Sequence, residues 1–402
     1  MRRAAIVAGL AFAACSSPAA NEGGVGLPPP GGSCPRGLAV ASSDYASSTI
    51  SVCGADGKVL RAAMLTSGSR APGVSQALSG DVVLPSTRPR SGRMVLIDRY
   101  PNSVITFVDT STGAVTRQID VSTGFPSNPH DYLETREGRA LVTRYERNPK
   151  AGRAPFDAGG DVLAIDTSTG AIAARIELAT PADGAFQPRP DRMLEVDGVA
   201  WVLLQRLDGS FQSAGDGRIV GIDEATEAVA FTVDLPGAAN CGAAARSPSG
   251  KLVAVACSGL LRDRAVEGQR SAVVLLDAST RPPKIIRTVP APAGVPLLAQ
   301  IGFASESTLL GGTYGSLDAG RTDTIVAIDA STGAITRLAD AGQAFVVGDV
   351  RCAPGCGPCF VTDARANAIR VFSPDPGGRL VEGVAQPVDR VTGLPPRYAG
   401  FL

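Results

Sequence analysis

One short pattern recurs along this chain: an apolar strand, the turn Asp-x-Ser-Thr-Gly, and a second apolar strand. Its clearest copies read ITFVDTSTGAV, VLAIDTSTGAI, IVGIDEATEAV, VVLLDASTRPP and TIVAIDASTGAI. The shared aspartates are Asp109, Asp166, Asp223, Asp277 and Asp329, with weaker copies of the pattern around Cys53 and Ser373. Strand-built repeats spaced roughly 40–55 residues apart are typical of a β-propeller. Because seven copies are enough to close a ring, the sequence predicts an all-β fold, a seven-bladed β-propeller of four-stranded antiparallel blades.

The unit 93–133 shows how one blade is expected to form. The segment 93–100 (RMVLIDRY) is predicted as the innermost strand, 103–109 as the second and 114–121 as the third, and the fourth follows the proline loop 128–130. This division places the starts of the seven blades near Gly37, Arg93, Arg139, Val199, Lys251, Thr308 and Cys359. In the Asp-x-Ser-Thr-Gly turn the aspartate can accept backbone N–H groups and the glycine supplies a positive φ. We therefore expect the repeated aspartates to be structural.

The order of these elements resembles a known repeat. A strand, Ile-Asp-x-x-Thr-Gly and another strand, then a proline loop, a strand and a Pro-Ser-Gly or Glu-Gly turn, is similar to the YVTN-type repeat of bacterial seven-bladed propellers. These belong with the quinoprotein-dehydrogenase-like propellers. The resemblance covers about residues 37–390 and implies the architecture, but no activity, because the family includes binding, cell-surface and uncharacterised proteins. The chain lacks the tryptophan docking motifs of quinone-dependent enzymes, so no cofactor is expected.

The N-terminus has the pattern of an exported lipoprotein. Arg2 and Arg3 precede an apolar run over residues 4–14 that is too short to span a bilayer. The stretch LAFAAC ending at Cys15 resembles a bacterial lipobox, with Phe12 in place of the usual leucine. The resemblance implies a signal peptide over residues 1–14 and diacylation of Cys15, which would anchor the protein in a membrane without a transmembrane helix. The alternative is ordinary signal cleavage that leaves Cys15 as a thiol.

Composition divides the remaining chain into a tether and one domain. Residues 16–32 are small, polar and rich in glycine and proline. We assign residues 15–35 to the lipidated cysteine and a flexible tether, and residues 36–402 to the propeller. Ser16, rather than aspartate, after the lipidated cysteine favours the outer membrane as the site of anchoring. A monomer is expected.

The balance of acidic and basic residues indicates which classes of partner the protein can bind. The whole chain has a formal net charge of zero, and loss of the signal removes two arginines and no acidic residue. Such a near-neutral surface without basic clusters argues against nucleic acid as a partner.

Seven cysteines remain after Cys15, and in an exported protein they are expected to form disulfides. Cys241 and Cys257 lie almost symmetrically about the turn 247–250, so a hairpin would place them opposite one another, and we predict that they are bonded. The cluster Cys352-x₃-Cys356-x₂-Cys359 could bind zinc, but a fourth ligand is needed and the chain has a single histidine. A disulfide from this cluster to Cys34 or Cys53, across the seam between the last and first blades, is favoured over a metal site, and no metal is expected.

Polar residues at equivalent strand ends are the candidates for a binding site. Propeller ligands usually bind where such ends meet at the mouth of the central channel. The predicted mouth residues are Asp44, Tyr45, Asp98, Arg99, Tyr100, His130, Arg144, Tyr145, Arg206, Tyr314 and Asp363, with Asp131, Asp191, Arg192 and Gln205 nearby. Arginines, tyrosines and aspartates together could hold an anionic or polyhydroxylated ligand. Alternatively, Arg–Asp pairs at these positions could simply link adjacent blades.

No catalytic residues are predicted, because Gly-x-Ser-x-Gly, Ser-x-x-Lys and His-Glu-x-x-His motifs are absent. The leading hypothesis is a non-enzymatic, membrane-anchored envelope lipoprotein. Its propeller would bind either a small polar or anionic ligand or another envelope protein. The alternatives are an enzyme acting at the channel mouth, either a metal-assisted hydrolase similar to lactonases or a sugar dehydrogenase, and a purely structural envelope component.

Overall fold

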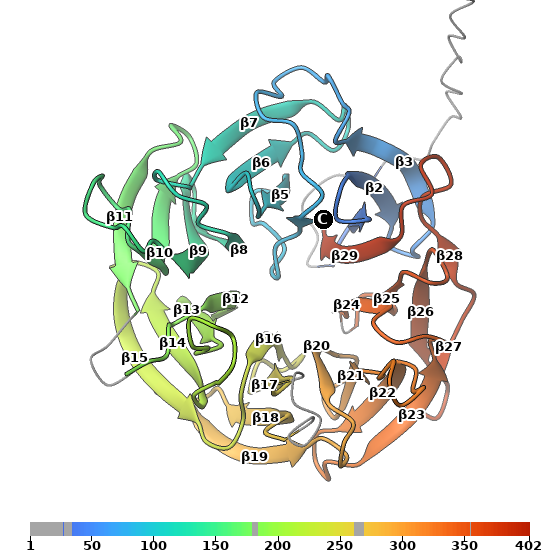
Figure 1. Cartoon of the computed structure of the whole chain (residues 1–402). Coiled ribbons are helices and arrows are strands. Elements are labelled where there is room, and N and C mark those ends of the chain that lie inside the picture. Colours follow the sequence, from blue (N-terminus) through green and yellow to red (C-terminus); the bar gives the residue numbers. More distant parts are fainter. Residues whose placement is uncertain (1–26, 28–33, 179–183, 261–268, 354) are drawn as a thin grey trace, which may run out of the picture.

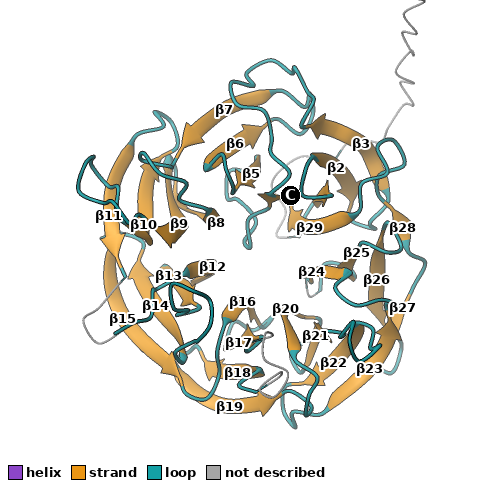
Figure 2. Cartoon of the chain, viewed as in Figure 1, coloured by secondary structure: helices purple, strands orange, loops and turns teal. Residues whose placement is uncertain are grey.

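Seven antiparallel sheets follow one another around a ring in the computed structural model of the chain (Figure 1). The structure describes residues 27, 34–178, 184–260, 269–353 and 355–402. All regular elements in these ranges are strands (Figure 2), and none of these residues lies in a helix long and apolar enough to cross a membrane. The predicted all-β, seven-bladed propeller is therefore confirmed. The signal peptide, Cys15 and most of the tether lie outside the described residues.

Each blade has four strands in sequence order from the channel outwards, and the C-terminal strand β29 completes the first blade. The innermost strands are β29(Pro396–Phe401), β4(Val82–Val83), β8(Pro129–Arg136), β12(Pro190–Val196), β16(Cys241–Arg246), β20(Leu297–Phe303) and β24(Val347–Arg351). The second strands are β1(Gly37–Ser43), β5(Met94–Asp98), β9(Arg139–Arg147), β13(Val199–Leu204), β17(Leu252–Cys257), β21(Thr308–Thr313) and β25(Cys359–Asp363).

The two outer positions complete the blades. The third strands are β2(Ser48–Gly54), β6(Val104–Val108), β10(Gly159–Asp166), β14(Gly217–Asp223), β18(Ala272–Asp277), β22(Thr324–Asp329) and β26(Ala368–Pro374). The outermost are β3(Val59–Thr66), β7(Val115–Asp120), β11(Ile172–Glu177), β15(Ala228–Leu235), β19(Lys284–Pro290), β23(Ile335–Asp340) and β27(Leu380–Glu382), and the short β28(Gln386–Pro387) also pairs with β26.

The predicted division into blades was wrong by one strand. β5, which was expected to be innermost, is second in its blade, and the strand after the proline loop, β8, begins the next blade instead of ending its own. The shift arises because β29 occupies the innermost position beside β1. Hydrophobic patterning could not reveal which strand of each repeat is innermost, because β1 and β5 are buried on both faces, as an innermost strand would be.

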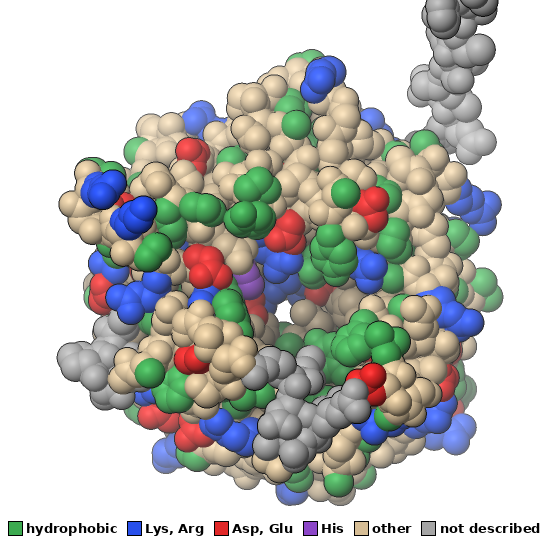
Figure 3. All heavy atoms as spheres, viewed as in Figure 1, with side chains coloured by type: hydrophobic (Ala, Val, Ile, Leu, Met, Phe, Trp, Pro, Cys, Tyr) green, Lys and Arg blue, Asp and Glu red, His purple; other side chains and the backbone are tan. Residues whose placement is uncertain are grey.

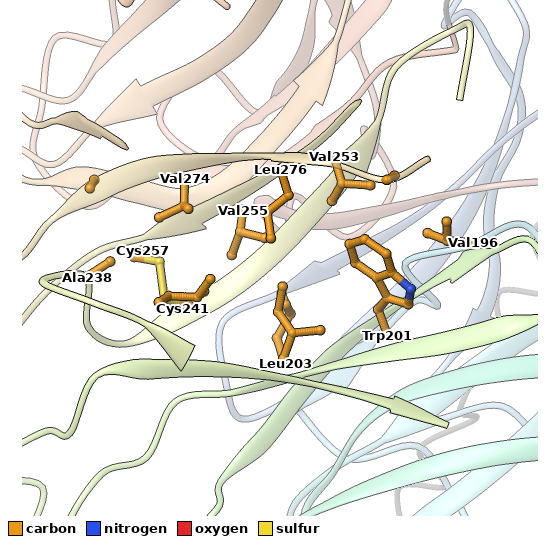
Figure 4. Close-up of a cluster of buried hydrophobic side chains, with 14 of the residues drawn as sticks. Val196, Trp201, Leu203, Ala238, Cys241, Val253, Val255, Cys257, Val274 and Leu276 are labelled. Carbon is orange, nitrogen blue, oxygen red and sulfur yellow. A yellow bond between two sulfur atoms is a disulfide. The ribbon is translucent and has the colours of Figure 1, made fainter. Parts of the chain in front are cut away.

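The core lies in layers between adjacent blades. In one layer, Trp201 and Leu203 of the fourth blade pack against Val253 and Val255 of the fifth (Figure 4). Each blade thus buries both faces against its neighbours, which explains why the strands read as continuous apolar runs.

The repeated turns confirm the structural role of their aspartates. Asp109 accepts hydrogen bonds from the backbone N–H groups of Ser111 and Thr112, at 2.8 and 3.2 Å, and Gly113 follows with φ of 78°. Asp329 repeats the arrangement, and its hydrogen bonds lower the pKa of its carboxyl to about 2. These aspartates lie in turns between third and fourth strands, away from the channel.

Three disulfides join six of the cysteines. The predicted Cys241–Cys257 bond links paired positions of β16 and β17 (Figure 4). Cys34–Cys356 ties the segment before β1 to the last blade, as expected for a bond across the seam, and Cys352–Cys359 closes a short loop. Cys53 is buried and free. Three disulfides indicate an oxidising, exported environment for the protein.

Candidate functional site

Polar side chains from several blades converge on one face of the ring, which we call the mouth face. Because neighbouring strands are antiparallel, the starts of the innermost strands and the ends of the second strands lie on the same face. His130 and Asp191 lie at the starts of β8 and β12, whereas Arg99 directly follows β5. The centre of this face is hollowed, with basic and acidic side chains around the hollow (Figure 3).

We call the polar residues that interact around this hollow the central cluster. Its members are Asp81, Arg99, His130, Asp131, Tyr145, Asp191, Arg192, Gln205, Tyr314, Asp349 and Tyr398. They come from six of the seven blades and their connecting loops.

His130 is held between the third and fourth blades. Its Nδ1 atom lies 2.8 Å from Oδ1 of Asp191, and its ring stacks on Tyr145 with centroids 4.1 Å apart. The Tyr145 hydroxyl donates to Gln205 at 2.6 Å, and the Gln205 amide donates to the other oxygen of Asp191 at 2.5 Å. The guanidinium of Arg189 covers Tyr145 at 5.0 Å. This closed set of contacts fixes the orientation of the imidazole.

The protonation states of this pair follow from burial and neighbouring charges. Burial lowers the pKa of His130 below its ordinary value of 6.5, and Arg99 and Arg192 act in the same direction, although Asp191 opposes them. Burial would raise the pKa of Asp191, but His130 and Arg192 outweigh it and the pKa is lowered. At neutral pH the ionised carboxylate can only accept, so Nδ1 carries the proton and Nε2 is an acceptor.

Arg99 forms a second group of contacts between the first and second blades. Its guanidinium donates to Oδ1 of Asp81, at 3.0 Å from Nε and 2.5 Å from Nη2, and Nη2 also donates to the Tyr398 hydroxyl at 3.1 Å. Since that hydroxyl accepts from Arg99, its own hydrogen is available to another acceptor.

Arg192 spans part of the channel from the fourth blade. Its Nη1 atom donates to the carbonyl oxygen of Leu84, in the loop after β4, at 2.9 Å. Burial would lower the pKa of Arg192, but the charges of Asp349, Asp131 and Asp191 outweigh it and the pKa is raised. Arg192 therefore lies among three carboxyl groups.

Asp349, on β24, has one satisfied and one unsatisfied oxygen. Oδ2 accepts from Arg351 and from the backbone N–H of Ala399, both at 3.0 Å. Oδ1 is buried and has no hydrogen-bond partner among the described residues, and the side chain is 0% exposed. A buried unpaired carboxylate oxygen costs about 1–3 kcal/mol or more, so it is a natural position for a donor from a ligand or water.

Four of the predicted mouth residues instead make contacts that link strands and turns. Arg144 is 0% exposed and pairs with Asp161 of the neighbouring strand β10. Arg206 donates to the carbonyl oxygen of Asp216 at 3.0 Å. Asp98 accepts from Ser79 and Asn102, and Asp363 from the backbone of Arg365 and Ala366. These contacts are made within blades and their loops, and the Arg144–Asp161 pair does not link adjacent blades, as the structural alternative had supposed.

The other predicted residues divide between the outer rim and the cluster. Asp44 accepts backbone hydrogen bonds within its own turn, and Tyr45 and Tyr100 are 61% and 59% exposed in loops of the mouth face. Tyr314 is half-buried, and the charges of Asp323, Tyr398 and Asp191 help burial raise its pKa to about 12. Of the predicted set, Arg99, His130, Tyr145 and Tyr314 therefore meet in the central cluster.

Sequence reasoning did not identify Asp81, Asp349 and Tyr398. All three lie on or beside innermost strands, which the shifted division of the blades had assigned to the outermost position. A correct assignment of the innermost strands would have made these residues candidates, because β29 and β24 both carry polar residues near their mouth-face ends.

Among the described residues, no group of three or more His, Cys, Asp or Glu side chains is arranged to hold a metal ion. The cluster offers three guanidinium or imidazole groups, several carboxylates and tyrosine hydroxyls. Such a mixture of donors and acceptors is suited to hydrogen-bonding a small polar molecule.

Neither a protein-family model nor a curated protein matches this sequence. Solved structures with the same fold do. A periplasmic gluconolactonase of Pseudomonas aeruginosa is 17% identical, with 91% of this chain and 98% of that one covered and a TM-score of 0.58. A hypothetical selenium-binding protein of Sulfolobus tokodaii is 10% identical, with 92% and 94% covered and a TM-score of 0.59. A protein from Lactobacillus plantarum is 10% identical, with 91% and 99% covered and a TM-score of 0.57. At these identities the likeness concerns the fold alone.

Proposed function

We propose that this protein is an exported lipoprotein, anchored through Cys15 and sorted by Ser16 to the outer membrane, whose propeller binds a small polar ligand in the central cluster. The observation that carries the binding role is the buried, unsatisfied Oδ1 of Asp349, a residue whose charge acts on Arg192 within the central cluster. Buried polar groups are normally satisfied, and a site that leaves one open is suited to receive a donor.

The direction of the mouth agrees with an anchored binding protein. β1 starts at Gly37 on the face opposite the mouth and ends at Ser43 on the mouth face. The Cys34–Cys356 disulfide joins the chain just before β1 to the loop between β24 and β25, which is also on the opposite face. A tether from the N-terminus would therefore enter the domain on the face opposite the mouth and leave the mouth open to a ligand.

Native mass spectrometry of the protein purified from its exported compartment tests the binding role. We expect a co-purifying small molecule on the wild-type protein and its loss from the Arg99→Gln variant. Arg379→Gln is the matched control, because Arg379 is 84% exposed and pairs only locally with Asp375. A wild-type protein that carries no ligand, and takes none up from extracts of the same compartment, would contradict the proposal.

A hydrolase that opens lactones is the second candidate. It is favoured by the His130–Asp191 contact, which leaves Nε2 of a neutral imidazole as an acceptor suited to a general base, and by the fold that the chain shares with a gluconolactonase. Proton release from gluconolactone would measure this activity. Release above the uncatalysed rate that is lost in His130→Gln would support the hydrolase, and equal rates with and without the protein would exclude it for this substrate.

A further inference from the structure

The central cluster has an arrangement of charges that bears on the kind of ligand it accepts. The cationic side chains in the cluster or in contact with it are Arg99, Arg189, Arg192 and Arg351. The carboxyl groups are those of Asp81, Asp131, Asp191 and Asp349, together with that of Glu146, which pairs with Arg189. Each guanidinium already lies beside at least one carboxylate. An anion entering the hollow would therefore meet no excess of positive charge, and would approach Asp191 and Asp349 at the cost of like-charge repulsion.

The polar groups of the cluster call for both donors and acceptors on a ligand. Oδ1 of Asp349 is buried and needs a donor. Arg192 donates from Nη1 to the carbonyl oxygens of Leu84 and His130, and because a guanidinium only donates, a ligand group that contacts it must be an acceptor. Nε2 of His130, the acceptor nitrogen of the neutral ring, can receive a donor. The ionised carboxylate or phosphate group of an anionic ligand could accept from Arg192, but that group has no hydrogen to give to Asp349 or to His130.

A hydroxyl group meets both requirements, because it donates one hydrogen bond and accepts others. Several hydroxyls on one neutral framework could face Asp349, Arg192 and His130 at once without adding charge. The Tyr398 and Tyr314 hydroxyls have the same dual character and can complete such a network.

From this arrangement we propose that the central cluster binds a neutral polyhydroxylated molecule, a free sugar or a polyol, in preference to its anionic derivatives. This inference rests on the proposed binding function and specifies its ligand class. Asp349 and Asp191 accept from hydroxyls, Arg192 donates to them, and the carboxylates exclude ligands with a net negative charge.

Calorimetric titration of the full chain with matched pairs tests the preference. The probes are glucose, galactose, mannose and xylose, each compared with its aldonate, and the hexoses also with their 6-phosphates, at low and at physiological ionic strength. We expect at least one neutral sugar to bind at least ~10-fold more tightly than its anionic partners, a difference of ~1.4 kcal/mol. Its affinity should not change with salt, because no net charge is neutralised on binding.

Two variants separate the charge effect from a general loss of binding. Asp349→Asn removes the negative charge with little change of shape, and should narrow the preference for the neutral sugar by raising the relative affinity of the aldonate. Tyr398→Phe removes one hydroxyl and keeps the ring, and should weaken both members of a pair equally. If Asp349→Asn does not fold because Arg351 loses its partner, the wild-type comparison and Tyr398→Phe still decide the question.

The possible outcomes test the neutral ligand class separately from the proposed ligand-binding function. Tighter binding of an aldonate or a sugar phosphate, weakened by salt, would overturn the ligand class while supporting a ligand-binding mouth. Binding of neither neutral nor anionic probes, with no co-purifying molecule, would overturn both.

Discussion

His130 and Asp191 form a contact between two neighbouring blades, with Nδ1 and Oδ1 2.8 Å apart at the mouth of the channel. Each residue lies at the start of an innermost strand, so the contact is set by the relative position of β8 and β12 and not by a local turn. The geometry couples the packing of two blades to the protonation of the chain's single histidine.

The burial of His130 predicts a defined pH dependence of stability. Because the pKa of His130 is lowered in the folded protein, the unfolded state takes up a proton first as the pH falls below 6.5. The free energy of unfolding should therefore decrease from pH 6.5 down to the folded-state pKa, and the decrease should be absent from His130→Gln. Denaturant titrations of both proteins at several pH values measure the difference. Burial raises the pKa of Asp98, but this residue is present in both proteins, so its contribution to the pH dependence cancels in the comparison. A pH-independent difference between them would contradict the assignment.

A second prediction concerns the buried Arg144–Asp161 pair. Both side chains are 0% exposed, and Arg144 donates to both oxygens of Asp161 at 2.8 and 2.7 Å. Arg144→Met should lower the free energy of unfolding by about 3 kcal/mol, the lower end of the usual range because Arg175 still pairs with Asp161. Arg99→Gln, at a partly exposed pair, should cost less stability but weaken ligand binding. A stable Arg144→Met variant with lost binding would place Arg144 in the site instead.

The disulfides allow a third prediction, on closure of the ring. Cys34 and Cys356 are separated by 322 residues in sequence, Cys241 and Cys257 by only 16. Because a cross-link restricts the unfolded chain more when the loop is longer, removing the first bond should cost about 5 kcal/mol and removing the second about 3 kcal/mol. Paired alanine variants compared by denaturant unfolding test this order. The reverse order would show that β29 alone secures the seam.

A fourth prediction concerns the membrane anchor. Two acyl chains on Cys15 would hold the protein at a membrane, whereas a single chain binds only reversibly. The wild-type protein should fractionate with membranes and carry the mass of the acyl groups on an N-terminal peptide beginning at Cys15. Cys15→Ser should appear in the soluble fraction with an unmodified mass. A wild-type protein that is soluble and unacylated would contradict the anchor.

The fold could be predicted from the sequence because five of the seven blades share an aspartate turn whose chemistry is local, and the other two carry weaker copies of the pattern. Asp109 and Gly113 act within five residues, and their spacing is visible in the chain. The site could be predicted only in part. Arg99 and His130 occur at recognisable strand ends, but Arg144, at an equivalent strand end to Arg99, has a buried partner within its own blade.

The contacts that make the cluster depend on closure of the ring. Asp349 and Tyr398 come beside Arg192 and Arg99 only when β29 takes the innermost position of the first blade. No local pattern encodes that arrangement, so these residues could be recognised only in the folded protein.

Ligand binding at the channel mouth can be tested directly with the single histidine as a probe. In the ¹H–¹³C spectrum of a protein prepared without a histidine tag, the imidazole signal belongs to His130 alone. Titration with the co-purifying ligand, or with the tightest-binding sugar, should shift this signal saturably, with the same affinity as calorimetry gives, and should leave it unshifted in the Arg99→Gln variant. A ligand that binds the wild-type protein without any change in the His130 signal would show that the channel mouth is not its site.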